Sequence, residues 1–337
     1  MTSSLLQGGT RRRPGRRRRY AVLLVVLAAL VASAGTGVYL VQGTDDGDTS
    51  TTASRSPAPA TPDRSEVQTP TRPATQVPPG ISLVGPNAFN VRLKAGQPRT
   101  AMVFDMRTGR VLYKRNPTGR MPIASLTKIM TALIVVDRTK PHEKIRVPRD
   151  ALNYSGSGVG VLPKGKKVPV EGLLAGLLLP SGNDAAIALA DHVAGSQGKF
   201  VRLMNRRAKQ LGLNCTHFAS PHGLEPRNRS CAADLAAMAR MAMDQPRISR
   251  VVKNKQLAVK FPIKGGKLYV NSTNPLLRLR YKGTIGLKTG STDKAGHCFV
   301  GVVRRGKREL GVVLLHSPDT GSQAKQLLDA AFKAGRA

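Results

Sequence analysis

The sequence predicts an α+β fold, in which a β-sheet carries helices on its faces. Two strand-like runs open the globular part of the 337-residue chain, at 101–105 and 111–114. Apolar residues at helical spacing fill the middle, and strand-like runs return after residue 250 before a last helical segment. Strands from both ends of a chain that enclose a helical middle are typical of a sheet covered by helices.

The helical segments form a series between the two sets of strands. The first begins near Ser125 and continues through the apolar run 129–136. Further helices are expected at 173–179, 185–193, 200–211, 232–243 and 324–334. Ser230 or Asp234 is expected to cap or start the helix at 232–243, because both side chains are typical of helix N-termini.

The remaining strands are predicted from short runs rich in β-branched and other apolar residues. They lie at 256–261, 267–269, 284–288, 298–303 and 309–316. A turn at 107–110 joins the first two strands of the chain into a hairpin.

An uncharged stretch at 20–41 follows a cluster of arginines at 11–13 and 16–19. At about 1.5 Å per helical residue it is long enough to cross a hydrocarbon layer of about 30 Å. The arginines predict that residues 1–19 stay in the cytoplasm and that 20–41 is a single-pass signal anchor in the cell membrane, with the rest of the protein outside. A cleaved signal peptide is the alternative, since Ala32-Ser33-Ala34 resembles a cleavage site, and the protein would then be secreted.

Residues 42–82 are predicted to be a disordered linker. Ser, Thr and Pro dominate this stretch, and few of its side chains are apolar enough to form a core. The composition therefore predicts a spacer between the membrane segment and a globular part that begins at residue 83.

The chain carries a formal net charge of +35, with 54 Lys and Arg against 19 Asp and Glu. A strong positive field favours polyanionic surroundings. Aromatic residues make up only 4% of the sequence and no nucleic-acid-binding module is recognisable, so nucleic acid is not expected as a partner. Anionic wall polymers or lipid headgroups are the partners that this charge favours.

The three cysteines suit an oxidising compartment. Cys215 and Cys231 are 16 positions apart and flank the polar loop 221–224, so a disulfide between them is expected, with Cys298 free inside a strand. Three isolated thiols are the alternative. The spacing of Cys and His residues does not support a zinc site, and neither a metal nor another cofactor is expected.

The segment Ala124-Ser125-Leu126-Thr127-Lys128 is the first candidate for chemistry. Ser125 and Lys128 are three residues apart, so on a helix they share one face and their side chains can meet. A serine hydroxyl becomes a nucleophile only when a base takes its proton, and a lysine is such a base only when burial or nearby cations keep it neutral. Alone the motif is weak, because a solvated helix face has the same spacing.

Two later motifs strengthen the catalytic interpretation. Ser181-Gly182-Asn183 follows an apolar helical run and Pro180, and Lys288-Thr289-Gly290 ends a predicted strand. Three short polar motifs in this order are much less frequent by chance than any one of them. The same set, with an aspartate in place of Gly182, marks penicillin-binding proteins and class A β-lactamases.

On these motifs, residues 83–337 resemble serine-type D-alanyl-D-alanine carboxypeptidases, the low-molecular-mass penicillin-binding proteins of peptidase family S11. Other segments that read like the family are 181–186, 211–213, 216–218, 221–224 and 288–292. The resemblance implies a serine D,D-peptidase domain at 83–337. It also implies a penicillin-binding/β-lactamase-like fold, with an antiparallel sheet flanked by helices and an all-helical part.

By this resemblance, Ser125 is the nucleophile that forms an acyl-enzyme on the peptide between two D-alanines. Lys128 is its base, and Ser181 relays a proton to the leaving amine. Asn183 holds the substrate amide or Lys128. The substrates implied are peptidoglycan stem peptides and β-lactams, which connects the protein with the cell wall and cell shape.

The third motif is expected to bind the substrate. Lys288 helps to keep Lys128 neutral and attracts the substrate carboxylate, to which Thr289 offers a hydroxyl. Gly290 leaves room for substrate backbone along the strand edge. The resemblance implies an oxyanion hole made by the backbone N–H groups of Ser125 and Ser291.

Several alternatives remain open. A transpeptidase or endopeptidase of the same fold fits the same motifs. A class A β-lactamase is less favoured, because the segment Glu225-Pro226-Arg227-Asn228 has its Asn one position too close to the Glu. A wall-binding protein without activity is disfavoured by the intact motifs. His217 and His222 are expected to be structural, since no G-x-S-x-G motif surrounds any serine.

Overall fold

The computed structural model describes residues 80–335. The predicted cytoplasmic segment 1–19, the predicted anchor 20–41 and nearly all of the predicted linker lie outside these residues. Among the helices within 80–335, none has the length and apolar character needed to cross a membrane. Ile81 is buried and Ser82 forms a parallel bridge with Arg110, so the fold begins before residue 83, where the sequence placed its start.

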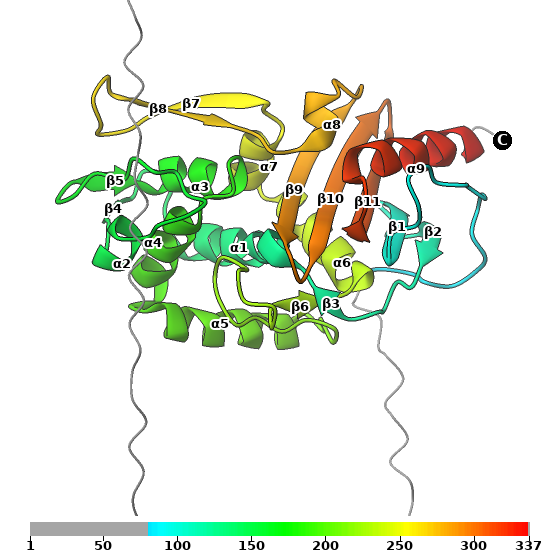
Figure 1. Cartoon of the computed structure of the whole chain (residues 1–337), viewed down its shortest axis with the longest axis horizontal. Helices are drawn as coiled ribbons and strands as arrows, with labels where there is room; N and C mark the ends of the chain where they lie inside the picture. Colours follow the sequence, from blue (N-terminus) through cyan, green and yellow to red (C-terminus); the bar gives the residue numbers. More distant parts are fainter. Residues whose placement is uncertain (1–79, 336–337) are drawn as a thin grey trace, which may run out of the picture. The chain divides into compact units, whose positions relative to one another are not determined.

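A five-stranded antiparallel sheet forms one side of the molecule (Figure 1). Its strand order is β2-β1-β11-β10-β9. The bounds are β1 Thr100–Asp105, β2 Val111–Arg115, β9 Thr284–Thr292, β10 Gly296–Arg305 and β11 Arg308–Ser317. Because β1 pairs with β11, the two ends of the described chain meet in the centre of the sheet, and β9 is left at one edge.

The two faces of the sheet contribute to separate hydrophobic cores. Residues of β11 between Leu310 and Leu315 alternate between the two cores, as expected for a strand whose side chains point to opposite faces. The C-terminal helix α9 (Thr320–Ala334) covers one face. The helices α6 (Ala232–Asp244) and α7 (Pro246–Val252) contact the other, so the sheet is sandwiched between helices (Figure 1).

A helical part lies beside the sheet and is built around α1 (Lys128–Arg138). The first eight residues of α1 are buried, because this helix is in contact with α3, α4, α5, α6 and α7. The remaining members are α3 Val170–Leu178, α4 Asn183–Ala194 and α5 Gln197–Gln210. A helix that is apolar on nearly all sides requires such an enclosed position.

Several short strands and helices connect the main elements. Three small antiparallel pairs join β3 (Met121–Pro122) with β6 (Arg229–Ser230), β4 (Lys144–Arg146) with β5 (Lys167–Pro169), and β7 (Gln256–Lys260) with β8 (Lys267–Asn271). The short helices are α2 (Arg149–Leu152) and α8 (Pro275–Arg278). The hairpin β7–β8 is separate from the five-stranded sheet and lies over the helical part (Figure 1).

The predicted α+β fold is confirmed, and each predicted strand and helix within 80–335 is present with small shifts at its ends. The short strands β3 to β6 and the helices α2, α7 and α8 were not predicted, because they are too short to show periodicity. The predicted capping of α6 is wrong: Cys231 is its N-cap residue, and no side chain caps the helix. The Asp234 carboxylate instead accepts hydrogen bonds from the N–H of Cys215 and the hydroxyl of Thr216.

The expected disulfide is present. Cys215 Sγ is bonded to Cys231 Sγ at 2.14 Å, and Cys298 is free and buried. The bridge closes the loop that contains residues 221–224 and ties it to the start of α6. Asp234 lies near both sulfur atoms, but sulfurs that are bonded to each other are not thiolates and do not act as metal ligands.

Candidate active site

Ser125 lies in one turn of 3-10 helix, η1 (Ala124–Thr127), that continues directly into α1. The nucleophile candidate is therefore at the N-terminal end of a helix, as the sequence predicted. Lys128 Nζ lies 3.0 Å from Ser125 Oγ, so the expected contact between these two side chains is present. Ser125 is partly exposed, whereas Lys128 is fully buried.

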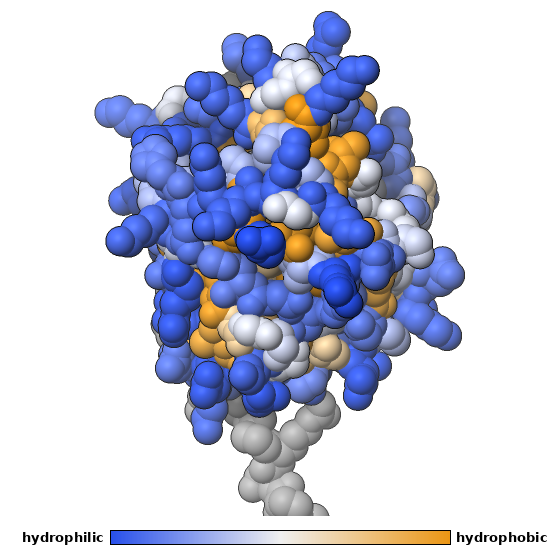
Figure 2. Space-filling view, turned by 90° about the vertical axis from the view of Figure 1, so that its left-hand side faces the viewer, coloured by the Kyte–Doolittle hydropathy of each residue, from blue (hydrophilic) through white to orange (hydrophobic). Residues whose placement is uncertain are grey.

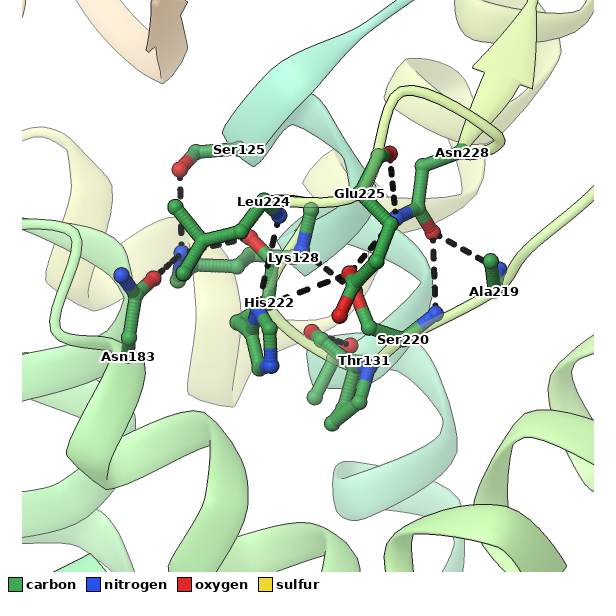
Figure 3. Close-up of polar contacts among 12 residues, drawn as sticks. Ser125, Lys128, Thr131, Asn183, Ala219, Ser220, His222, Leu224, Glu225 and Asn228 are labelled. Carbon is green, nitrogen blue, oxygen red and sulfur yellow. Dashed lines mark hydrogen bonds and ion pairs between the residues drawn. The ribbon is translucent and has the colours of Figure 1, made fainter. Parts of the chain in front are cut away.

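Lys128 has two further partners (Figure 3). Its Nζ lies 2.6 Å from Asn183 Oδ1 and 2.7 Å from the backbone carbonyl oxygen of His222. Both oxygens only accept hydrogen bonds, so they take two N–H groups of the amine. In a neutral lysine the remaining position on nitrogen is a lone pair, and it faces the Ser125 hydroxyl. This is the geometry that a general base requires.

Burial and charge both favour the neutral form of Lys128. Burial lowers the pKa of Lys128 well below its usual value, and the charge of Lys288 lowers it further, whereas Asp184 acts in the opposite direction. Lys288 is itself buried, and this burial lowers its pKa to about 7. An exposed lysine carries a full positive charge near neutral pH. Burial shifts both Lys128 and Lys288 toward their neutral forms.

Asn183 and Asp184 open α4 and organise one wall of the site. Asn183 Nδ2 donates to the Tyr154 hydroxyl at 2.7 Å, which fixes the amide with its oxygen toward Lys128. The Asp184 carboxylate accepts hydrogen bonds from the backbone N–H groups of Val159 and Gly160 at 2.8 and 2.9 Å. The loop before α3 is thereby tied to the start of α4.

Ser181 has an unusual local structure. Its φ is +70°, in the left-handed region that few residues other than glycine adopt without cost. Its Oγ is buried and has no hydrogen-bond partner among the described residues. An unpaired buried hydroxyl on strained backbone is costly for stability, and such costs concentrate at functional sites. Ser181 lines the cavity in front of Ser125 but makes no hydrogen bond to Ser125 or Lys128 within 80–335.

Gly290 allows β9 to lie directly against the turn that carries Ser125. A Cβ added at Gly290 would be 2.8 Å from the carbonyl oxygen of Ile123 and 3.0 Å from the backbone nitrogen of Ser125. The sequence had suggested that this glycine leaves space for the substrate. The structure gives a different reason, which is the close approach of η1, while β9 as an edge strand still has its outer side open.

The neighbours of Gly290 differ in their positions. Lys288 is buried and donates to the backbone oxygen of Thr289 at 3.0 Å. The hydroxyl of Thr289 lies 2.5 Å from that of Thr273, in the segment after β8. Ser291 is exposed, and its hydroxyl lies 3.1 Å from His297 Nδ1 on β10. The segment 288–291 therefore presents the hydroxyls of Thr289 and Ser291 to the cavity and buries the amine of Lys288.

A cavity of about 310 Å³ lies in front of Ser125. Ser181, Thr289 and Ser291 also line it, so residues of all three motifs meet around one space. Arg278 of α8 lines the same cavity and is exposed. This arginine could not be recognised from the sequence, because nothing in its local sequence indicates that α8 is folded against the motifs.

The charge of this cavity is positive. Among the described residues that line it, none is acidic, and Arg278 and His297 are the basic ones. Neither Lys128 nor Lys288 is part of the lining. Of the two buried lysines, Lys128 reaches Ser125 from behind, and Lys288 acts on Lys128 through its charge.

His222 contributes its backbone rather than its ring. Its side chain is buried, and desolvation lowers its pKa to about 4, so the imidazole is neutral near pH 7. The Asn228 side chain holds the same loop, with Oδ1 accepting from the N–H groups of Ala219 and Ser220 (Figure 3). Sequence reasoning left His222 as a structural residue and missed that its carbonyl oxygen binds Lys128.

Comparisons with known proteins identify the family. Residues 88–319 match the peptidase S11 family, which is described as D-alanyl-D-alanine carboxypeptidase. The D-alanyl-D-alanine carboxypeptidase DacF of Bacillus subtilis is 33% identical over 247 residues, which are 71% of this chain and 63% of DacF. The chain thus spans somewhat less than two thirds of the length of this relative.

Two solved structures share the fold. The Streptomyces K15 DD-transpeptidase is 32% identical with a TM-score of 0.67, and the match covers 72% of this chain and 100% of that one. A D-alanyl-D-alanine carboxypeptidase from Mycobacterium tuberculosis H37Rv is 31% identical with a TM-score of 0.67, over 77% of this chain and 96% of that one. The fold is therefore that of the DD-transpeptidases and D,D-carboxypeptidases, as the motifs implied.

Proposed function

Because the chain belongs to the peptidase S11 family of D-alanyl-D-alanine carboxypeptidases, we propose that it removes the terminal D-alanine from peptidoglycan stem peptides through an acyl-enzyme on Ser125. The observation that carries the proposal is the buried Lys128, whose Nζ lies 3.0 Å from Ser125 Oγ and whose pKa is lowered. A serine with a neutral amine at this distance is an activated nucleophile.

The first half-reaction is acylation. Lys128 takes the proton of Ser125 while Oγ attacks the carbonyl carbon between the two D-alanines, and the carbonyl oxygen becomes an oxyanion. The C–N bond then breaks, and the leaving amine receives a proton. The unpaired hydroxyl of Ser181 lines the same cavity and supplies the relay between Lys128 and this amine.

The second half-reaction is hydrolysis of the ester. A water molecule attacks the acyl carbon, its proton passes to Lys128, and Ser125 leaves with its oxygen reprotonated. The N–H groups of Ser125 and Ser291 are the proposed oxyanion donors in both halves. This assignment is supported by the packing of η1 against β9 at Gly290, which brings the backbone of Ser125 close to that of β9.

We assign recognition of the substrate's terminal carboxylate to Arg278 and Thr289 rather than to Lys288. Arg278 is exposed to the cavity and always charged, and Thr289 offers its hydroxyl in the same space. Lys288 is 1% exposed and has a pKa of about 7, so it presents neither a full charge nor an accessible amine near neutral pH. Its role in the proposal is to lower the pKa of Lys128.

A transpeptidase is the alternative, since the K15 relative is described as a DD-transpeptidase. An endopeptidase of the same fold acts on the same kind of bond within cross-links. In both cases Ser125 and Lys128 keep their roles, and the choice depends on whether water or an amine reaches the ester.

The test is incubation of the purified protein with a peptide that ends in D-Ala-D-Ala, with free D-alanine and any cross-linked product measured separately. We expect D-alanine release without cross-linking, and covalent labelling by a fluorescent penicillin. Ser125→Ala should abolish both signals, whereas Ser249→Ala on α7 should keep both. A cross-linked product reassigns the protein as a transpeptidase, and rapid turnover of penicillin reassigns it as a β-lactamase. A wild-type protein that neither releases D-alanine nor binds penicillin refutes the catalytic proposal.

We also propose that the protein is held in the cell membrane by residues 20–41, with the domain outside. The support is the uncharged stretch after the arginine cluster and the disulfide between Cys215 and Cys231, which suits an oxidising compartment. N-terminal sequencing of the mature protein is the test. A start at Gly35 would establish a cleaved signal peptide instead, and a domain that resists external protease in intact cells would refute export.

A further inference from the structure

A second cavity, of about 710 Å³, lies between the strand pair β4–β5 and the hairpin β7–β8 and shares no lining residue with the cavity in front of Ser125. We call it the hairpin groove. Its rim carries four exposed lysines, Lys144 and Lys167 from the pair β4–β5 and Lys260 and Lys267 from the hairpin β7–β8. Figure 2 faces this side of the molecule and shows a hydrophilic surface in which apolar patches lie in the recesses.

The two strand pairs β4–β5 and β7–β8 place like charges directly opposite each other. Lys260 is paired with Lys267 across β7 and β8, and Arg146 is paired with Lys167 across β4 and β5. Cross-strand neighbours on one face lie close together, so like charges at these positions destabilise a hairpin. Two such pairs beside one groove form a concentrated positive field.

The acids near the groove are already engaged. Glu171 is the acid among the described residues that line it, and its Oε1 lies 2.6 Å from Nε of Arg247. Glu143, next to Lys144 in the chain, lies 2.6 Å from Nε2 of His192. The rim lysines make no ion pair within 80–335, so their charge is left for a ligand.

The floor of the groove is apolar and fixed. Val259 and Phe261 contribute to it, and a Cβ added at Gly172 would lie 2.7 Å from the Phe261 ring. The ring is therefore packed directly on the first turn of α3. A ligand that fits this shape has carbon-rich stretches over the floor and anionic groups at both rims.

We propose that the hairpin groove binds a linear phosphodiester polymer, in which polyol units separate the phosphate groups. Lysines rather than arginines form the rim, and an ammonium group is a point charge that suits phosphate from any direction. The binding site does not depend on the proposed peptidase activity, so the two proposals fail independently.

The groove is connected to the active site through α3 and β8. The N-terminal turn of α3 lines the groove through Glu171 and Gly172, and the residues after its C-terminal end lead to Ser181. The segment after β8 leads to Thr273, whose hydroxyl contacts Thr289. The groove and the cavity in front of Ser125 therefore belong to one folded framework. A polymer bound in the groove would hold the active site close to that polymer.

The test measures binding of fluorescently labelled poly(glycerol phosphate) to the full-length chain in a neutral detergent, by anisotropy. The variant Lys260→Gln/Lys267→Gln should lose about 10- to 30-fold in affinity, since each lysine near an anionic surface contributes about threefold to sixfold. The matched control Lys282→Gln/Lys307→Gln has the same charge change at exposed positions outside the groove and should change affinity less than about twofold.

Two further measurements separate a groove from a general charge effect. Without polymer, the groove variant should unfold at an equal or higher temperature than wild type, because a like-charge pair is removed, and its D-alanine release from a soluble peptide should be unchanged. Equal losses in the groove and control variants overturn the proposal. Displacement by a soluble short-chain phosphatidylglycerol at matched phosphate concentration overturns it too, and assigns the groove to lipid headgroups.

Discussion

Lys288 lowers the pKa of Lys128 although neither side chain lines the cavity in front of Ser125. Both lysines are buried behind the surface, where a positive charge has few water molecules to stabilise it. The same burial that makes Lys128 a base therefore costs stability, and the two effects can be measured separately.

Lys288→Gln should move the pH dependence of acylation to higher pH. Acylation requires neutral Lys128, so its rate rises as the pH passes the pKa of Lys128. Lys288 is charged below its pKa of about 7 and lowers the pKa of Lys128, so removal of this charge raises it. The measurement is the rate of penicillin labelling from about pH 5 to about pH 10. An unchanged midpoint would show that Lys288 does not tune the base.

Lys288→Met should stabilise the fold, and more so at low pH. The pKa of Lys288 is about 7 in the fold and about 10.4 in an unfolded chain, so between these values the unfolded chain binds the additional proton. The destabilising effect of Lys288 is complete below about pH 7 and fades as the pH rises toward about 10. We expect a gain of about 1–4 kcal/mol in the free energy of unfolding at about pH 6 and a smaller gain at about pH 9.5.

Chemical denaturation at the two pH values measures the effect of Lys288→Met. The exposed Lys282 offers a control, since Lys282→Met should change stability by less than about 0.5 kcal/mol at either pH. A larger gain at high pH than at low pH would contradict the burial argument.

Ser181→Ala should reduce acylation without destabilising the protein. The Ser181 hydroxyl has no partner within 80–335, so its removal breaks no hydrogen bond and relieves an unpaired buried group. We expect an unfolding temperature equal to or above that of wild type, with a loss of about 100-fold or more in acylation rate, as is typical for a positioned proton relay. If both activity and stability stay at wild-type values, Ser181 is not the relay.

Arg278→Ala should weaken recognition of the substrate carboxylate. A charge-assisted hydrogen bond contributes about 1.5–3 kcal/mol, which corresponds to a loss of about 10- to 100-fold in kcat/KM. A substrate with a C-terminal amide lacks the carboxylate and should lose much less. The control is Arg280→Ala, an exposed arginine two residues further on that does not line the cavity. Equal losses for acid and amide substrates would remove Arg278 from this role.

Gly290→Ala should displace the nucleophile. The added Cβ would lie 2.8 Å from the Ile123 carbonyl oxygen, so β9 and η1 must separate, at a cost of about 1–3 kcal/mol. Gly198→Ala on α5 is the matched control, because a Cβ there would meet only the end of the Arg202 side chain, at 3.9 Å, and alanine favours the helix. The unfolding temperature and the rate of penicillin labelling should both fall for Gly290→Ala and stay at wild-type values for Gly198→Ala. Wild-type labelling in this variant would show that the contact does not position Ser125.

Local features of the site were predictable from the sequence, and distant ones were not. Ser125 and Lys128 are three residues apart, so helix geometry alone brings them together. The other partners of Lys128 come from Asn183 and from the backbone of His222, 94 residues away from Lys128. A backbone carbonyl has no signature in the sequence, which explains why the role of His222 was missed.

The same limit explains the assignment of Lys288. The sequence of the strand did not show whether Lys288 faces the cavity or the core. As part of a substrate-binding motif, this lysine was expected in the cavity. The structure buries it, because Lys288 lies on the same face of β9 as Gly290, and this face packs against η1. Arg278 is the last residue of α8, a helix of four residues that has too little periodicity to be predicted.

The disulfide between Cys215 and Cys231 has a consequence for when the site is assembled. It closes the loop whose residue His222 supplies a hydrogen-bond acceptor to Lys128. A covalent closure of about 15 residues contributes about 3 kcal/mol of loop entropy. With reduced thiols, only hydrogen bonds hold this loop, among them those of Thr131 to the Pro221 carbonyl oxygen and of Ala219 and Ser220 to the Asn228 side chain. A newly made chain in a reducing environment should therefore hold its proposed base, Lys128, less firmly than the oxidised protein does, because the His222 carbonyl oxygen is one of the partners of Lys128.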